Sequence, residues 1–219
     1  MKKLSHLIIL IGFMVILNAC QSNGEQIVSK EAEIIPHASL ENNRVYKQLK
    51  KDCKLTWTAW HLGGMDPRNG TLDYREAELL VNNGKLNSMS ILLDMNSITV
   101  LDLPDDAIIE LTDHLKSDDF FKVDSFPISK FEMTKLEGLE GDYNSKITGN
   151  LTILGISKSI SFKGNLIITE KEIELKSQEF IINRAEWGMT YNAKGTVGIP
   201  LDYLISDDVQ FQVDISILK

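Results

Sequence analysis

Two histidines are the side chains in this sequence that are best suited to acid–base chemistry. His61 ends an alternating apolar stretch, and His114 directly follows Asp113, so an acid–histidine pair is available there. Acyl transfer would also need an exposed nucleophile on an elbow such as Gly-x-Ser-x-Gly, which the sequence lacks. We therefore do not expect an enzyme, and a hydrolase or isomerase that uses one of these histidines is the least favoured alternative.

Metal and cofactor sites have equally little support in the sequence. No His-x-x-x-His, no cysteine pair at metal-ligand spacing and no Gly-rich phosphate loop occurs. We therefore expect no metal ion and no cofactor.

Two polar side chains, Arg184 and His61, could bind a ligand without catalysis. Arg184 could hold a phosphate with its planar guanidinium, or it could form a salt bridge with an acid such as Glu186 or Asp202. His61 could contact a polar head group at a cavity mouth, or it could be a hydrogen-bonded histidine at a strand end. His114 lies near a helix C-terminus, where the helix dipole favours a structural role.

Large aromatic residues recur along the chain. They could form the wall of an apolar cavity, or they could simply fill a core. The aromatic residues we assign to a candidate ligand-binding wall are Trp57, Phe120, Phe121, Phe131, Phe162 and Trp187.

From residue 54 onward, apolar and polar residues alternate with a period of two, which predicts half-buried β-strands. In 54–62, Leu55, Trp57 and His61 would share one face, and Asn82-Asn83-Gly84 is a hairpin turn signal. The stretches with this pattern are 54–62, 69–84, 85–98, 126–138, 143–155, 157–170, 171–183 and 207–218. Open edges invite aggregation. The sequence therefore predicts a mainly β protein, a closed antiparallel barrel of about eight strands.

One stretch departs from the β pattern. In 105–116, Ile108, Leu111 and Leu115 lie at helical spacing, with aspartates at the start and a lysine at the end. We expect one amphipathic helix near one mouth of the barrel. The two phenylalanines that follow it would point in different directions if extended, so at least one should enter the core.

The N-terminus predicts export and lipid anchoring. Residues 1–19 combine two lysines with an apolar run that is too short to span a bilayer, which indicates a signal peptide. The run ends in Leu-Asn-Ala-Cys, which resembles a lipobox, so Cys20 is the expected acylation site and the expected membrane contact. An ordinary signal peptide with an incidental cysteine is the alternative. We interpret 20–43 as a tether and 44–219 as the folded domain, in which Cys53 is a small apolar residue.

The net charge is −8 at pH 7. An acidic surface argues against nucleic acid as a partner and against electrostatic docking to anionic lipid. Gln21 follows the cysteine in place of aspartate, which favours the outer membrane over the inner membrane of the cell envelope.

Several stretches, in this order, resemble the YceI-like family of bacterial secreted and lipid-anchored proteins. They are "KLTWTAWHLGG", "NGTLDY", "LTDHLKSDDFFKVDSFPISKFEMTKL", "ITGNLTILGISKSISF", "INRAEWGMTYN" and "SDDVQFQVDISI". The family often has Phe at Trp57 and Trp187, and the apolar residues that end 192–204 have no assigned place. The resemblance implies an extended lipocalin-like barrel whose long apolar cavity holds a polyisoprenoid or similar amphiphile.

Two functions stay open beside the enzyme. The first is an envelope lipoprotein that binds one long, isoprenoid-like chain in the barrel. The second is a structural or interaction module with a solid core. An eight-stranded barrel can be filled by its own side chains or can hold one ligand, so the strand pattern alone does not decide between them.

Overall fold

The computed structural model describes residues 24–63 and 67–219. The predicted signal peptide 1–19 and the predicted acylation site Cys20 lie outside these residues. Among the residues described, no helix is long and apolar enough to cross a membrane.

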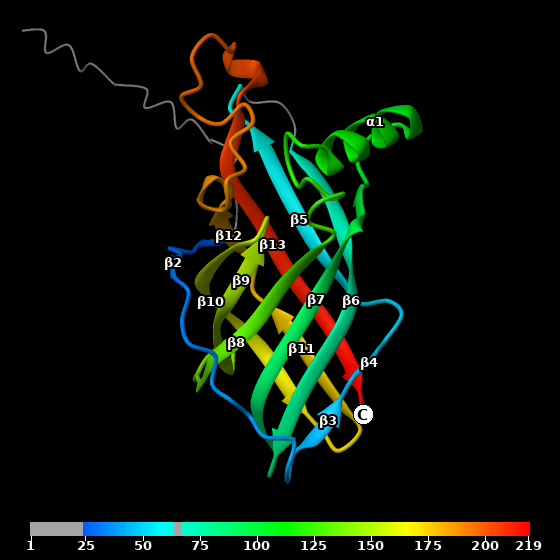
Figure 1. Ribbon diagram of the computed structural model, residues 1–219, viewed down its shortest axis with the longest axis vertical. Coiled ribbons are helices and arrows are strands. Elements are labelled where there is room, and N and C mark those ends of the chain that lie inside the picture. Colours follow the sequence, from blue (N-terminus) through cyan, green and yellow to red (C-terminus); the bar gives the residue numbers. More distant parts are fainter. Residues whose placement is uncertain (1–23, 64–66) are drawn as a thin grey trace, which may run out of the picture.

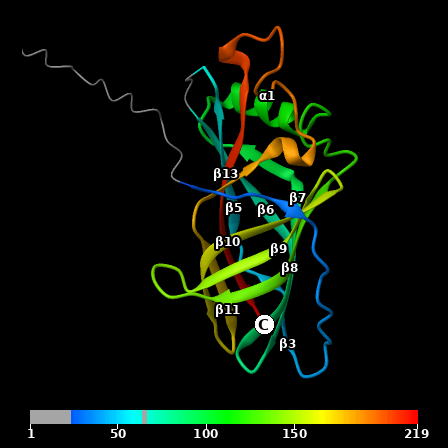
Figure 2. The same cartoon turned by 90° about the vertical axis from the view of Figure 1, so that its left-hand side faces the viewer.

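Eight antiparallel strands form a closed barrel (Figures 1 and 2). The strands are β5 (Lys54–His61), β6 (Arg68–Asn82), β7 (Lys85–Val100), β8 (Ile128–Gly138), β9 (Ser145–Ile153), β10 (Ile156–Ile168), β11 (Glu172–Ser177) and β13 (Ile205–Leu218). From β5 to β11 each strand pairs with the next, and β11 pairs with β13. The ring closes because β13 also pairs with β5. The predicted fold class is confirmed.

The predicted strand 171–183 is divided into β11 and a shorter strand, β12 (Phe180–Asn183), and both pair with β13. At the break, the Ser177 hydroxyl accepts a hydrogen bond from the backbone N–H of Val213 at 2.9 Å. A side chain therefore takes the place of a ladder bond, and the strand continues in a new register.

Two hairpins turn through residues with positive φ. Asn83 and Gly84, at 50° and 73°, join β6 to β7, and Leu154 and Gly155, at 51° and 74°, join β9 to β10. Two-residue turns of this kind match the twist of the flanking strands. The predicted Asn-Gly turn is confirmed.

The one α-helix among the residues described, α1 (Asp105–Lys116), has the predicted bounds and lies between β7 and β8 in sequence. None of its residues is fully buried, so the helix covers the upper end of the barrel without filling it (Figure 1). After it the chain turns tightly, with the N–H of Phe121 bonded to the carbonyl of Leu115 at 3.1 Å.

The segment that we expected to be a tether lies partly on the barrel wall. Between residue 24 and β5 the structure has four short strands, namely β1 (Glu25–Gln26), β2 (Lys30–Glu31), β3 (Arg44–Tyr46) and β4 (Gln48–Leu49). β1 pairs with β12 and β2 with β10. Glu33 exchanges two hydrogen bonds with Asn150, at 2.8 and 2.7 Å. Residues 24–33 are therefore attached to the barrel.

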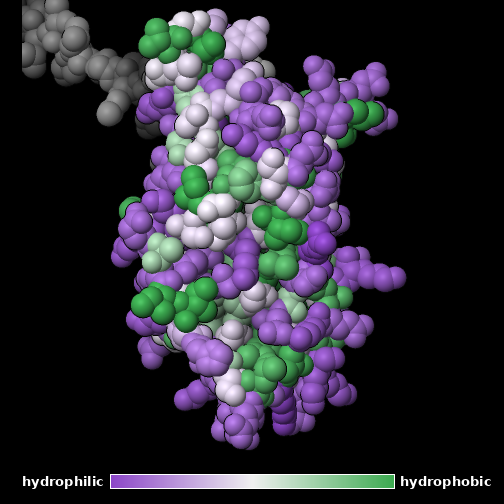
Figure 3. All heavy atoms as spheres, viewed as in Figure 1, coloured by the Kyte–Doolittle hydropathy of each residue, from purple (hydrophilic) through white to green (hydrophobic). Residues whose placement is uncertain are grey.

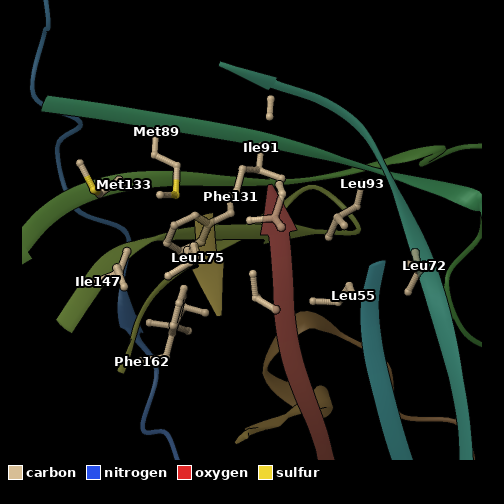
Figure 4. Packing of buried hydrophobic residues seen from close by; sticks show 14 of the residues in the cluster. Leu55, Leu72, Met89, Ile91, Leu93, Phe131, Met133, Ile147, Phe162 and Leu175 are labelled. Atoms are coloured by element: carbon tan, nitrogen blue, oxygen red, sulfur yellow. The ribbon is translucent and has the colours of Figure 1, made fainter. Parts of the chain in front are cut away.

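The lower half of the barrel is filled by apolar side chains. Figure 4 shows Met89, Met133, Ile147 and Leu175, which belong to one cluster of buried apolar residues from different strands. Tyr46 closes the lower core, and its hydroxyl bonds the carbonyl of Thr169 at 2.7 Å. The larger free space lies higher in the barrel, beneath α1, and a smaller one borders this packed region.

Candidate functional site

The upper cavity lies between α1, the turn that follows it and the barrel wall. Its volume is about 130 Å³. Leu111 and Leu115 line it from the helix, and Trp57 and Ala59 line it from β5. The walls are apolar except at His61, Arg68 and Arg184, so the cavity suits a hydrocarbon chain.

A second cavity of about 80 Å³ lies deeper in the barrel. Four residues line both cavities and so form the boundary between them: Leu72, Phe121, Ile153 and Phe211. Three of these belong to barrel strands, whereas Phe121 comes from the turn after α1. The two cavities are consecutive along the barrel, and Phe121 acts as a wedge between them.

Three phenylalanine rings of the lower cavity pack in a row. The ring of Phe162 lies 5.6 Å from that of Phe131 and 5.0 Å from that of Phe180, the latter nearly parallel. Burial raises the pKa of the Tyr74 hydroxyl far above its usual value, so this phenol is neutral. The lower cavity therefore has no ionised side chain in its wall.

Two cavity aromatics lie against glycines of neighbouring strands. Trp57 is the cross-strand partner of Gly70, and the Phe131 ring lies over Gly149. A Cβ on Gly149 would lie 2.4 Å from Cζ of Phe131. Glycine therefore leaves the room in which both rings lie flat on the wall.

His61, at the end of β5, is half-buried and lines the upper cavity. Its buried Nδ1 has no hydrogen-bond partner among residues 24–63 and 67–219. His114 lines neither cavity. Its Nε2 lies 3.0 Å from Oδ2 of Asp119, outside the cavity wall. The two histidines are therefore not placed together as a catalytic pair.

Arg184 is 3% exposed and lies in a short 3-10 helix, η1 (Arg184–Trp187). Its guanidinium donates hydrogen bonds to the carbonyls of Met189 and Tyr191, at 2.8 and 2.9 Å, and to those of Ser206 and Ile205, at 3.0 and 3.3 Å.

Burial lowers the pKa of the Arg184 guanidinium, and the carboxylate of Asp207, 3.9 Å away, opposes that shift. The side chain borders the upper cavity, but its donors bind the chain's own carbonyls. The arrangement favours the structural alternative for Arg184 over phosphate binding.

The remaining candidates divide between the cavity and the core. Phe120 lines the upper cavity and packs against His114 and Tyr191, with ring centroids 5.1 and 5.2 Å away. This aromatic cluster joins α1 to the chain after η1.

Trp187 is fully buried, lines neither cavity, and donates a hydrogen bond from Nε1 to the carbonyl of Leu151 at 3.0 Å.

Sequence reasoning missed part of the cavity wall. Ile205, Val209 and Phe211 of β13 line the upper cavity, as does Met189. The alternation along β13 could have identified Val209 and Phe211 as inward-facing. No local pattern indicates Met189, because the bonds of Arg184 place it.

The site is an apolar cavity that is divided in two, enclosed by an antiparallel barrel and covered by one helix. It holds no group of His, Cys, Asp or Glu that could bind a metal ion, as is true of all the residues that the structure describes. These features define a closed antiparallel β-barrel with an apolar interior cavity. The YceI-like domain family model matches residues 46–217, and the chain belongs to this family.

Relatives of known sequence are distant. A UPF0312 protein of Pseudomonas aeruginosa is 29% identical over 109 residues, which are 50% of this chain and 50% of that protein. A UPF0312 protein of Pectobacterium atrosepticum is 28% identical over the same proportions. The alignments thus span about half the length of the curated relatives.

Solved structures share the fold. BcnA of Burkholderia cenocepacia has a TM-score of 0.57 at 18% identity, covering 75% of this chain and 95% of that one. A polyisoprenoid binding domain from Saccharophagus degradans has a TM-score of 0.57 at 10% identity, covering 80% and 99%. At these identities the likeness shows the common barrel fold.

Proposed function

We propose that this protein binds the apolar chain of an isoprenoid-like lipid inside its barrel and carries out no covalent chemistry. The observation that supports this most directly is the pair of consecutive apolar cavities beneath α1. Burial of apolar surface contributes about 25 cal/mol per Å² before the costs of binding. The printed description of the Saccharophagus degradans domain as polyisoprenoid-binding adds support from a protein of the same fold.

Cavity size limits how much of a chain fits. An engineered apolar cavity of about 150 Å³ takes up one benzene molecule. By that scale the two cavities, of about 130 and 80 Å³, hold roughly eight carbon atoms. A longer chain would extend past α1 or would displace the Phe121 wedge.

A solid-core interaction module is the second candidate, and the filled lower half of the barrel favours it. The two functions differ in whether a ligand chain enters the upper cavity beneath α1. A binding protein admits a chain next to Trp57, whereas an interaction module uses its outer surface alone.

The test is fluorescence quenching by a C18 acyl chain that carries bromine atoms. Trp57 and Trp60 line the upper cavity, and Trp187 does not. We expect saturable quenching at one chain per protein. Replacing Trp57 and Trp60 by Phe should leave Trp187 as the emitter and remove most of the quenching. Equal quenching before and after that replacement would contradict binding in the cavity.

The cell envelope is the proposed location. Acylation of Cys20 would attach the protein to a membrane, and the outer membrane is the proposed one because Gln, not Asp, follows the cysteine. The mass of the protein purified from a bacterial host tests the modification. A mass without acyl chains would rule it out.

A further inference from the structure

Residues 195–203, which we call the apical tip, present three apolar side chains to solvent. Val197 is 96% exposed, Leu201 59% and Tyr203 65%. The tip stands at the same end of the barrel as α1 (Figures 1 and 2), and Figure 3 shows apolar atoms at this end. Single exposed apolar residues are ordinary, but three within seven residues indicate an interaction site.

The apical tip is an ordered structure. A 3-10 helix, η2 (Leu201–Tyr203), lies within it, and the N–H of Thr196 bonds the carbonyl of Ala193 at 3.1 Å. At its base, the four carbonyls bound by Arg184 belong to the two chain segments that enter and leave the loop. Burying a guanidinium is costly unless it is well paired. The chain thus uses a buried charge to hold a loop that exposes apolar side chains.

The position of Gly24 limits where a lipid anchor could attach the barrel. A Cβ on Gly24 would lie 3.2 Å from Oε1 of Gln210, so the chain meets the wall at that level. Along β13, Ile205 at the helix end lies about 17 Å from Gln210, and Leu218 at the opposite end about 26 Å. Cys20 and Gly24 are four positions apart in the sequence, so the chain between them spans at most about 14 Å. A span of about 14 Å falls about 3 Å short of Ile205 and about 12 Å short of Leu218, so the helix end is the nearer of the two ends to an anchor on Cys20.

We propose that the apical tip inserts Val197, Leu201 and Tyr203 into the surface of a lipid bilayer, so that the upper cavity exchanges its chain directly with the membrane. This inference rests on the lipid-binding function and the Cys20 anchor proposed above. An apolar chain is poorly soluble in water. If the mouth of the upper cavity lies against the bilayer, the chain can pass between membrane and cavity without entering water.

Charge near the apical tip points to the apolar layer of the bilayer as its partner. Asp202 lies within the tip, and Asp207 and Asp208 lie at its base. These acids give no attraction to anionic lipid, so contact should depend on apolar burial and change little with salt.

The first test is the environment of a fluorophore on the tip. In the full chain with Cys53→Ser, and with Cys20→Ser as well if the mass shows no acyl chain, an environment-sensitive dye is attached to Val197→Cys. The matched control carries the dye on Lys85→Cys, the first residue of β7 after the β6–β7 turn. The protein is combined with phosphatidylcholine vesicles. We expect a several-fold rise in emission, and quenching by lipid-borne quenchers, at position 197 alone. The same response at both positions, or none at 197, would overturn the proposal.

This test separates the insertion of the apical tip from the Cys20 anchor and from the lipid-binding function. A protein mass without acyl chains would refute the anchor, while the dye at 197 would still show whether the tip enters added vesicles. An absence of chain binding in the cavity would refute the lipid-binding function and would leave the dye response unaffected.

The second test is the rate at which a pyrene-labelled prenyl chain moves from vesicles into the protein. The double variant Val197→Ser, Leu201→Ser should slow transfer by roughly tenfold, because two apolar contacts with the bilayer are lost. Equilibrium affinity should not change, since neither residue lines a cavity. The control variant Ile34→Ser, Leu40→Ser removes exposed apolar groups outside the tip and should transfer normally. Normal transfer in the tip variant, or a loss of equilibrium affinity, would overturn the proposal.

Discussion

Trp57 lies directly across the sheet from Gly70, and a Cβ on residue 70 would come within 2.5 Å of Cζ2 of the indole. The same Cβ would lie 1.9 Å from the carbonyl oxygen of Thr99 on the next strand. The wall of the upper cavity therefore depends on a glycine that permits an aromatic ring to lie flat against it.

Gly70→Ala should lower the free energy of unfolding by about 2 kcal/mol, because neither the indole nor the backbone carbonyl can move away freely. Chemical denaturation measures this change. Gly138→Ala is the matched control, since a Cβ there meets nothing within 4 Å, and it should change stability by less than about 0.5 kcal/mol. Equal effects of the two variants would show that Gly70 does not support the wall.

Arg184→Met should cost about 3 kcal/mol, because four carbonyls at the base of the apical tip lose a charged donor. Hydrogen exchange in 189–206 should accelerate with it. Arg44→Met, which removes an exposed partner of Glu170, should have almost no effect. Unchanged exchange in the loop would contradict the structural role of Arg184.

Phe121→Ala should join the two cavities, because Phe121 is the boundary residue that does not belong to the barrel wall. The variant should prefer longer chains than the wild-type protein does, which a comparison of C10, C15 and C20 prenyl alcohols by calorimetry would measure. Phe126→Ala is a control from the same turn that lines neither cavity. An unchanged length preference in Phe121→Ala would show that the wedge does not limit the ligand.

Acid should release the N-terminal segment from the barrel wall. The hydrogen bond from Lys163, at 2.7 Å, lowers the pKa of the Glu25 carboxyl, and a bond from Gln178 at 3.0 Å acts in the same direction. A group whose pKa is lower in the folded state stabilises above its unfolded pKa and loses that contribution as pH falls through the folded value.

Hydrogen exchange of residues 25–31 should therefore increase, relative to the barrel strands, as pH falls below about 4.5, the usual value for Glu25. The effect should be small, because the side chain is half-exposed. Glu25→Gln should show the same protection of residues 25–31, relative to the barrel strands, at neutral pH as at acid pH. A wild-type segment that stays equally protected at both pH values would contradict this account.

The strands and the helix could be predicted from sequence because each follows a period that local residues set. Alternation gave the eight barrel strands, and the apolar stripe with Leu111 and Leu115 gave α1 with its observed bounds. Positions that depend on contacts across the fold were harder. Residues 24–33 show no periodic pattern in the sequence. Their structure is set by contacts with distant residues, namely pairing with β10 and β12 and the hydrogen bonds of Glu33 with Asn150.

The candidate site was predictable where side chains alternate and less so where one distant residue organises a loop. Trp57, His61, Phe131 and Phe162 line the cavities, as strand alternation indicates. The sequence around Arg184 would be the same whether its guanidinium binds a ligand or a backbone carbonyl. Only the contacts in the folded loop distinguish these two roles. The Cys20 anchor and the outer-membrane location stay predictions.

The most direct test of the central claim compares lipids that co-purify with the full-length protein and with a variant whose upper cavity is filled. Ala59→Phe adds a ring inside the cavity from β5, and Leu115→Trp adds one from α1, so a folding defect in one variant leaves the other informative. Organic extraction and mass spectrometry should yield one long apolar chain per wild-type protein and much less from both folded variants. The same lipids in the same amounts from all three proteins would contradict binding in the barrel.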